Sequence, residues 1–191
     1  MIANIAPSTG KKLIFCILLL TLLVLAQGMV SAQQLELPTE MPEWQLQTQN
    51  GLQVSSQDYA GQPLVLHFWS TDCPYCKRLQ PGLDELAQDY ATEGLQILAI
   101  SLNEVQGAKP QDELIARGLQ LKTLVEGESL GFDNFKIFGT PTTIFVAPDG
   151  AILGSTMQSD PNDPQWRAVA NYLVSLSPRE LGHSDVETKF E

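Results

Sequence analysis

The chain has 191 residues and a formal net charge of −11, and its length fits a single domain with its own hydrophobic core. Such an acidic surface repels phosphate groups, which argues against nucleic acid and anionic lipid surfaces as partners. A domain of this size needs no disulfide staples to hold its core, so its cysteines are free for chemistry.

The first 32 residues differ in character from the rest. Lys11 and Lys12 precede the apolar stretch Leu13 to Ala26, and Val30-Ser31-Ala32 ends in small residues. This order is typical of a secretory signal, and residues 1–32 are therefore predicted to be removed after Ala32, leaving a periplasmic or other extracytoplasmic domain.

The alternative for this segment is an uncleaved membrane anchor. Residues 13–30 number just enough apolar positions to span a bilayer, and either outcome leaves the two lysines on the cytoplasmic side and the domain outside. Cys16 lies within the apolar stretch and is interpreted as a hydrophobic filler.

The remaining chain divides into three parts. Residues 33–43 are polar, carry Pro38 and Pro42, and are predicted as an extended linker. Residues 44–176 are the predicted folded domain. Residues 177–191 are predicted to be a disordered tail.

The folded part opens with a predicted hairpin, in which strands at 44–48 and 51–54 flank the turn signal Asn50-Gly51. A strand at 64–69 and a helix at 74–90 follow. The run 95–101 is continuously apolar, which is typical of a strand buried on both faces of a parallel sheet.

Later elements alternate in the same way. In chain order they are predicted as a helix at 111–117, a strand at 121–125, a short helical segment at 130–135, strands at 142–146 and 151–155 around the turn Pro148-Asp149-Gly150, and a helix at 164–176 with Asp163 as its N-cap. This order favours an α/β fold with a mixed sheet and helices on both of its faces.

Two cysteines, Cys73 and Cys76, are the candidate catalytic pair. Residues three apart in the first turn of a helix lie within disulfide distance on nearly the same face. Pro74 suits the first helical position, so the sulfur of Cys73 is expected at the positive end of the helix dipole, where a thiolate is favoured. Cys73 is the predicted nucleophile and Cys76 the resolving thiol.

Two other interpretations of this pair are disfavoured. A zinc site normally needs four ligands, and no second cysteine pair follows, while His67 and His183 cannot easily complete one. A purely structural bridge is disfavoured because it would close only four residues and restrict the unfolded chain very little.

The segment Phe68 to Lys77, with Pro81 eight positions after the first cysteine, resembles the active site of thioredoxins. Gly139-Thr140-Pro141-Thr142-Thr143 resembles the cis-proline loop of that family. Residues 59–63 (YAGQP) and 147–150 (APDG) are similar to the TlpA/ResA-like branch, whose members are exported. The resemblance covers residues 44–176 and implies a thioredoxin-like three-layer α/β/α sandwich, with a mixed central sheet and an N-terminal β-hairpin.

The resemblance also implies roles for single residues. Pro141 would be the cis-proline facing the sulfurs, with the backbone of Thr140 pairing with a substrate segment. Trp69 would pack beneath the site. Pro74 and Tyr75, between the cysteines, complete the candidate substrate-binding set.

Two positions depart from the thioredoxin pattern. Asp72 stands where a tryptophan is usual, and its charge should oppose thiolate formation. His67 replaces the buried acid, on the strand face that it shares with Trp69. We predict that His67 accepts the proton of Cys76; the alternative is a core histidine with a satisfied hydrogen bond.

The predicted function is therefore exported thiol-disulfide exchange, and the branch resemblance favours a reductant acting on cysteine pairs such as haem-attachment sites. Oxidase or isomerase action and a non-catalytic binding module are the alternatives, and the chain lacks the peroxiredoxin-like cysteine context of a peroxidase. The expected partners are cysteine-containing exported proteins and a membrane dithiol donor. The protein is expected to be a monomer without cofactor or metal, touching the membrane only through residues 13–30 if they are retained.

Overall fold

The computed structural model describes residues 37–176, so the predicted signal or anchor and the predicted tail lie outside the described residues. The elements follow in the order β1 (Gln45–Thr48), β2 (Gln53–Ser55), η1 (Ser56–Tyr59), β3 (Leu64–Trp69), α2 (Pro74–Asp89), η2 (Ala91–Glu93), β4 (Gln96–Ser101), α3 (Pro110–Ala116), β5 (Lys122–Val125), η3 (Leu130–Asn134), β6 (Thr142–Val146), β7 (Ile152–Thr156) and α4 (Gln165–Ser175).

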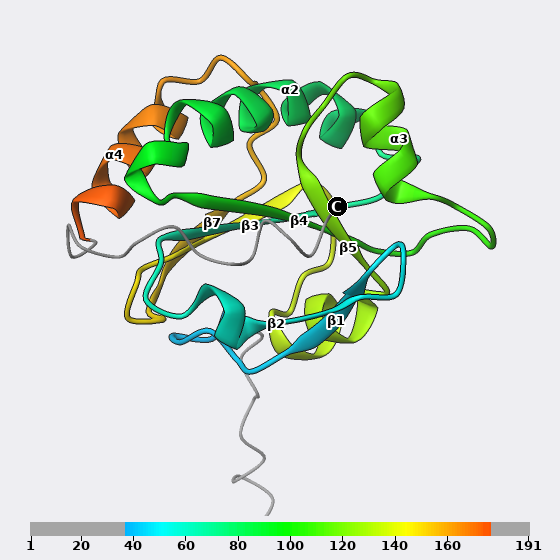
Figure 1. The fold of residues 1–191 in the computed structure, drawn as a ribbon, viewed down its shortest axis with the longest axis horizontal. Coiled ribbons are helices and arrows are strands. Elements are labelled where there is room, and N and C mark those ends of the chain that lie inside the picture. Colours follow the sequence, from blue (N-terminus) through cyan, green and yellow to red (C-terminus); the bar gives the residue numbers. More distant parts are fainter. Residues whose placement is uncertain (1–36, 177–191) are drawn as a thin grey trace, which may run out of the picture. The chain divides into compact units, whose positions relative to one another are not determined.

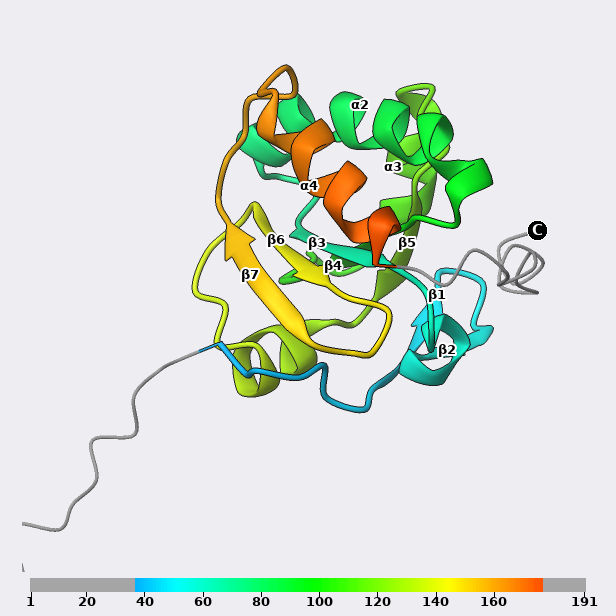
Figure 2. The same ribbon diagram turned by 90° about the vertical axis from the view of Figure 1, so that its left-hand side faces the viewer.

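The strands form one seven-stranded sheet in the order β2-β1-β5-β4-β3-β6-β7. Strands β3, β4 and β5 run parallel, whereas β6 pairs antiparallel with β3, β7 with β6, and β1 with β5. Helices α2, α3 and α4 cover one face, and η1 and η3 lie on the other (Figures 1 and 2). The mixed sheet and its N-terminal β1–β2 hairpin confirm the predicted thioredoxin-like α/β fold.

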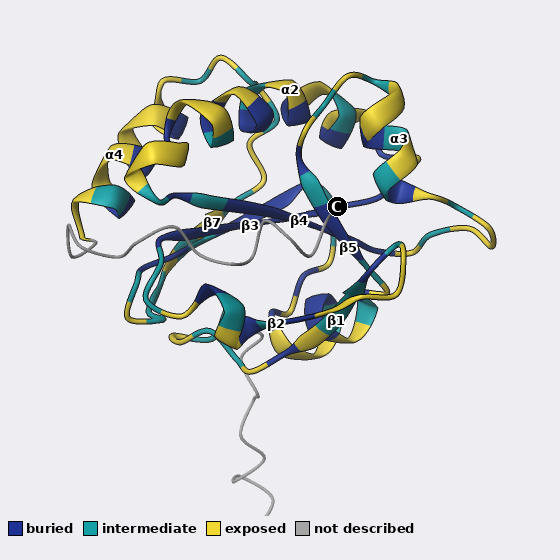
Figure 3. Ribbon diagram, viewed as in Figure 1, coloured by how far each residue is buried: buried dark blue, intermediate teal, exposed yellow. Residues whose placement is uncertain are grey.

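Two apolar cores lie on the two faces of this sheet. Strand β3 is buried at all six positions, and its side chains alternate between the cores: Leu66 and Phe68 join one, Val65 and Trp69 the other. The helices turn their buried sides to the sheet and their exposed sides to solvent (Figure 3). The second core, beneath α2, also contains both cysteines.

Helix α2 continues through Pro81, which lies in its interior. Proline has no N–H, so the carbonyl of Lys77, four residues earlier, loses its helical partner. Arg117, which follows α3, fills the gap: its guanidinium donates to that carbonyl at 2.6 Å and also to the side chain of Gln80. A side chain outside α2 thus replaces the backbone hydrogen bond that Pro81 removes from the helix that carries the cysteines.

The structure corrects two details of the sequence interpretation. The last helix begins at Gln165 with Pro164 as its N-cap, one residue later than predicted, although the Asp163 carboxylate still accepts from the Gln165 N–H at 2.9 Å. Within the predicted linker, the Met41 N–H donates to Gly150 and the Thr39 carbonyl accepts from Ile152. Residues 39–41 are therefore attached to the domain along the β6–β7 turn rather than forming a free spacer.

Between residues 37 and 176, no helix combines the length and the apolar character that crossing a bilayer would require.

Candidate redox site

The cysteine pair occupies the start of α2. Cys73 is the N-cap, Pro74 is the first helical residue, and the Cys73 sulfur accepts a hydrogen bond from the Cys76 N–H at 3.1 Å. The two residues are joined as a disulfide with their Cα atoms 5.3 Å apart. Cys73 retains 7% of its surface exposed and Cys76 none. Cys73 is therefore the more accessible of the two sulfurs, and its role as the nucleophile stays a prediction.

Trp69 supports the site from the sheet. Its side chain is fully buried in the same apolar core as both cysteines. Its indole N–H donates to the Thr123 hydroxyl on β5 at 3.0 Å, so a buried polar atom is satisfied and the ring orientation is fixed.

The loop before β6 lies at the same end of the sheet as the disulfide, because β3 leads into the cysteines and Phe68 pairs with Thr142. The peptide bond between Thr140 and Pro141 is cis, as the resemblance implies. Among the described residues, no backbone hydrogen bond involves Thr140. Its N–H and carbonyl are therefore available to an added strand.

Three large exposed side chains flank this end of the molecule: Tyr75 at 56%, Phe138 at 72% and Met157 at 61% exposure. Arg78 places its guanidinium 5.2 Å from the centre of the Tyr75 ring and donates to the Ser159 carbonyl, which ties α2 to the segment after β7. We call Tyr75, Phe138 and Met157 the apolar rim.

His67 lies fully buried on β3, on the face that Trp69 shares. Its Nδ1 lies 3.2 Å from the Thr143 hydroxyl, whereas Nε2 has no partner among the described residues. Burial lowers the pKa of His67 to about 3. In the oxidised protein this imidazole is therefore neutral at pH 7.

The turn before Cys73 carries acidic neighbours. The Asp72 carboxylate accepts from the Ser70 hydroxyl at 2.6 Å. Glu104, from the loop after β4, accepts from the N–H and the hydroxyl of Thr71. Sequence reasoning identified Asp72 but missed Glu104, although an acid three residues past a predicted parallel strand lies at the edge where the cysteines were expected.

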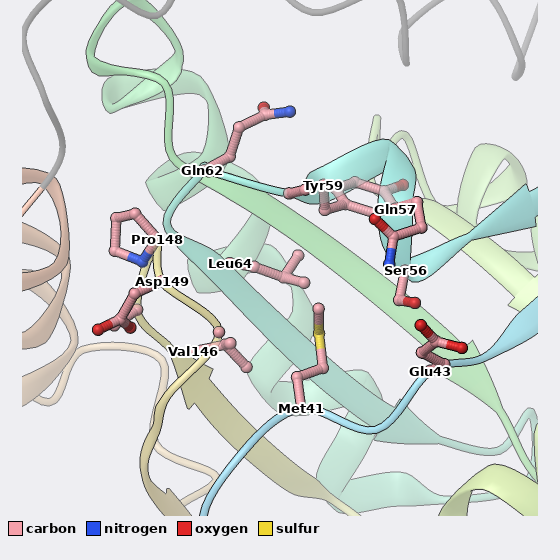
Figure 4. Close-up of a pocket in the computed structure, with 14 residues that line it drawn as sticks. Met41, Glu43, Ser56, Gln57, Tyr59, Gln62, Leu64, Val146, Pro148 and Asp149 are labelled. Atoms are coloured by element: carbon pink, nitrogen blue, oxygen red, sulfur yellow. The ribbon is translucent and has the colours of Figure 1, made fainter.

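A separate hollow of about 180 Å³ opens beside η1 and the turn after β6. It lies at the opposite end of β3 from the disulfide, since Leu64 begins that strand and lines the hollow. Met41, Leu64 and Val146 line it, with Glu43 and Ser56 at one side (Figure 4). It contains neither cysteine nor histidine, and no group of three potential metal-ligating side chains gathers anywhere within residues 37–176.

Proteins of similar sequence include a thiol-disulfide oxidoreductase. The chain matches the AhpC/TSA family over residues 38–154. It is 24% identical over 178 residues to the thiol-disulfide oxidoreductase ResA of Bacillus cereus, covering 88% of this chain and 98% of that protein. It is 26% identical over 115 residues to the thioredoxin-like protein YneN of Bacillus subtilis, covering 59% of this chain and 66% of YneN.

Solved structures share the fold. A thiol:disulfide interchange protein of the thioredoxin family from Chlorobium tepidum superposes with a TM-score of 0.63 at 19% identity, covering 72% of this chain and 97% of its own. A secreted disulfide oxidoreductase of Mycobacterium tuberculosis, described as homologous to DsbE, gives 0.59 at 18% identity, with 68% and 96% covered.

Proposed function

The chain belongs to the AhpC/TSA family, and we propose that it is an exported thiol-disulfide oxidoreductase acting on the cysteines of other proteins. The observation that carries the proposal is the bonded pair at the start of α2, with Cys73 reachable and Cys76 buried. The matches to ResA and YneN support the same chemistry. A structural staple would have little effect, since the bridge closes so short a loop.

The reaction balances as a two-electron exchange. In the reduced protein the Cys73 thiolate attacks one sulfur of a substrate disulfide and forms a mixed disulfide, and the first substrate thiolate leaves. Cys76 loses its proton and attacks the Cys73 sulfur, releasing the second substrate thiolate and restoring the bridge seen in the structure. The substrate is reduced by two electrons, and the Cys73–Cys76 pair is oxidised by two.

Substrate contacts are assigned to the same end of the sheet. The unpaired backbone of Thr140 would receive an extended substrate segment beside Pro141, with Trp69 and Pro74 fixing the pair. Tyr75 and the rest of the apolar rim would cover apolar side chains that flank the substrate cysteine.

His67 is proposed to act in the reduced protein. A buried thiolate at Cys76 would attract a proton to the imidazole and raise its pKa from the value of about 3 in the oxidised form. In support, His67 lies on the strand face of Trp69, which packs in the core that contains Cys76, and its Nε2 has no partner among the described residues, whereas Nδ1 lies 3.2 Å from the Thr143 hydroxyl. A pH profile of disulfide exchange that is the same in His67→Ala as in the natural protein would exclude the role.

We further propose that the protein works outside the cytoplasm as a reductant, on cysteine pairs of the kind that attach haem, and that a membrane dithiol donor recycles it. The support is the likeness to the TlpA/ResA-like branch at residues 59–63 and 147–150. Amino-terminal sequencing of the exported protein tests the first part: a mature chain starting at Gln33 indicates cleavage, and a retained Lys11 indicates an anchor.

The central experiment is capture of the mixed disulfide. Cys76→Ser removes the resolving thiol, so Cys73 should remain bonded to substrate proteins. Non-reducing electrophoresis should then show adducts that disappear when dithiothreitol reduces the mixed disulfide. Cys73→Ser should give none. Cys16→Ser, which changes the chain's remaining cysteine, is the matched control and should leave capture by Cys76→Ser unchanged.

The assay also separates the alternatives. A non-catalytic binding module would give no adducts and no reduction of insulin. A peroxidase would reduce hydrogen peroxide with Cys73 alone, forming a sulfenic acid that added dithiothreitol returns to the thiol. Full peroxide turnover by Cys76→Ser in the presence of dithiothreitol, without protein adducts in its absence, would overturn the proposal. An oxidase is identified with the natural protein instead: its Cys73–Cys76 disulfide would oxidise reduced substrate proteins, whereas its dithiol form would leave their disulfides intact.

A further inference from the structure

The four residues that lead into α2 form a tight turn. The Cys73 N–H donates to the Ser70 carbonyl at 3.1 Å, which leaves Thr71 and Asp72 at the two central positions. The N–H of the first central residue points out of such a turn and needs a partner from elsewhere. That partner is Glu104, 33 residues further along the chain, which accepts from the Thr71 N–H at 3.1 Å and from its hydroxyl at 2.6 Å.

The same turn carries an uncompensated negative charge. Asp72 lies next to the cysteine, and Glu128 stands near by, bonded to the N–H of Asn103 beside Glu104. None of the ion pairs within residues 37–176 includes any of these three carboxylates. Burial raises the pKa of Glu104, and Asp72 and Glu128 raise it further, while the two hydrogen bonds from Thr71 oppose them by favouring the ionised carboxylate.

We propose that Glu104 is a positioning residue of the redox site: its carboxylate fixes the turn that presents Cys73 and holds a negative charge there, which makes the dithiol a stronger reductant. The inference rests on the proposed redox function and adds a cause for the direction of electron flow. Glu104 is held in place by its two bonds to Thr71, whereas Asp72 is bonded only within its own turn.

The direction of the effect on the reduction potential follows from the stability of the Cys73 thiolate. The start of α2 stabilises an anion at Cys73 through the Cys76 N–H and the helix dipole. A carboxylate held at the preceding turn opposes this, because like charges repel at short range. A less stable thiolate shifts the equilibrium between dithiol and disulfide toward the disulfide, so the reduced protein donates its electrons more readily.

The test is Glu104→Gln, which removes the charge and keeps an oxygen acceptor for Thr71. At pH 7, the equilibrium constant for exchange with glutathione should shift about two- to fivefold toward the dithiol. This corresponds to a reduction potential ~9 to ~20 mV less reducing. Alkylation of the reduced Cys73 by iodoacetamide, which follows its thiolate fraction, should accelerate by a similar factor. Thr71→Val, which keeps the charge but loses one of its two anchors, should shift both quantities in the same direction by less.

Glu93→Gln is the matched control, because it removes an equal charge from the exposed end of η2, past the far end of α2. It should leave both quantities unchanged. If Glu104→Gln behaves like Glu93→Gln, or shifts either quantity the other way, the role of Glu104 is excluded while the redox function stands. If the natural protein itself does not equilibrate with glutathione, the proposed function has failed instead.

Discussion

Replacing His67 with glutamine is expected to make the stability of the protein far less sensitive to acid. The imidazole is fully buried with its Nε2 unpaired, and burial holds its pKa near 3, against about 6.5 in an unfolded chain. Between these values only the unfolded state binds the proton. The stability that depends on the neutral imidazole is therefore fully present above pH 6.5. It is lost progressively as the pH falls from 6.5 toward 3.

The expected size follows from the same two values. Each pH unit below 6.5 costs the native state about 1.4 kcal/mol, so this group accounts for a loss of about 3 kcal/mol at pH 4.5. The variant should lose about 1–2 kcal/mol at pH 7.5, because a buried hydrogen-bonding group is changed. Urea unfolding at pH 7.5, 6.0, 5.0 and 4.5 should show it equal to or more stable than the natural protein at the lowest pH.

Trp69→Phe is a suitable control for this measurement. It changes another buried residue of the same strand face, removes the hydrogen bond to Thr123 and leaves a cavity where the larger indole packed, at a cost of about 2–3 kcal/mol that no titration accompanies. Its stability curve should run parallel to that of the natural protein at every pH. If the curve of His67→Gln is equally parallel, the imidazole is not the acid-sensitive group.

The local sequence pattern was sufficient to predict those elements whose structure depends only on neighbouring residues. Strand β3 was predicted with its observed bounds, Leu64 to Trp69, because an apolar run between Pro63 and a turn admits few alternatives. Cys73 as the N-cap and Pro74 as the first helical residue could be predicted equally well, since capping depends on neighbouring residues. The short η1 was missed because four residues carry no periodic signal.

Contacts between distant segments lay beyond such reasoning. The Glu104 carboxylate reaches Thr71 across 33 positions, and Nδ1 of His67 meets Thr143 across 76. Hydrophobic periodicity placed each strand but not its lateral neighbours, so the pairing of β1 with β5 could not be foreseen. Nor could the attachment of residues 39–41, whose polar composition resembles that of a free linker.

Replacing Arg117 with methionine is expected to destabilise the protein by about 2–3 kcal/mol. Methionine keeps much of the apolar stem but removes the guanidinium. The Lys77 carbonyl, which has no helical donor because Pro81 lacks an N–H, would lose its partner, and so would the buried side chain of Gln80. An unpaired buried acceptor costs about 1–3 kcal/mol. Urea unfolding of the variant measures the loss.

A double-mutant cycle identifies the cause. Pro81→Ala restores a backbone N–H opposite Lys77, so in that background the loss caused by Arg117→Met should shrink by about 1 kcal/mol, the part due to the carbonyl. Glu113→Gln removes the ion pair to the side chain of Lys77 and leaves the carbonyl untouched, so its effect should add to that of Pro81→Ala. If the effect of Arg117→Met also adds to that of Pro81→Ala, the guanidinium stabilises the protein through Gln80 alone and does not compensate for the N–H that Pro81 lacks.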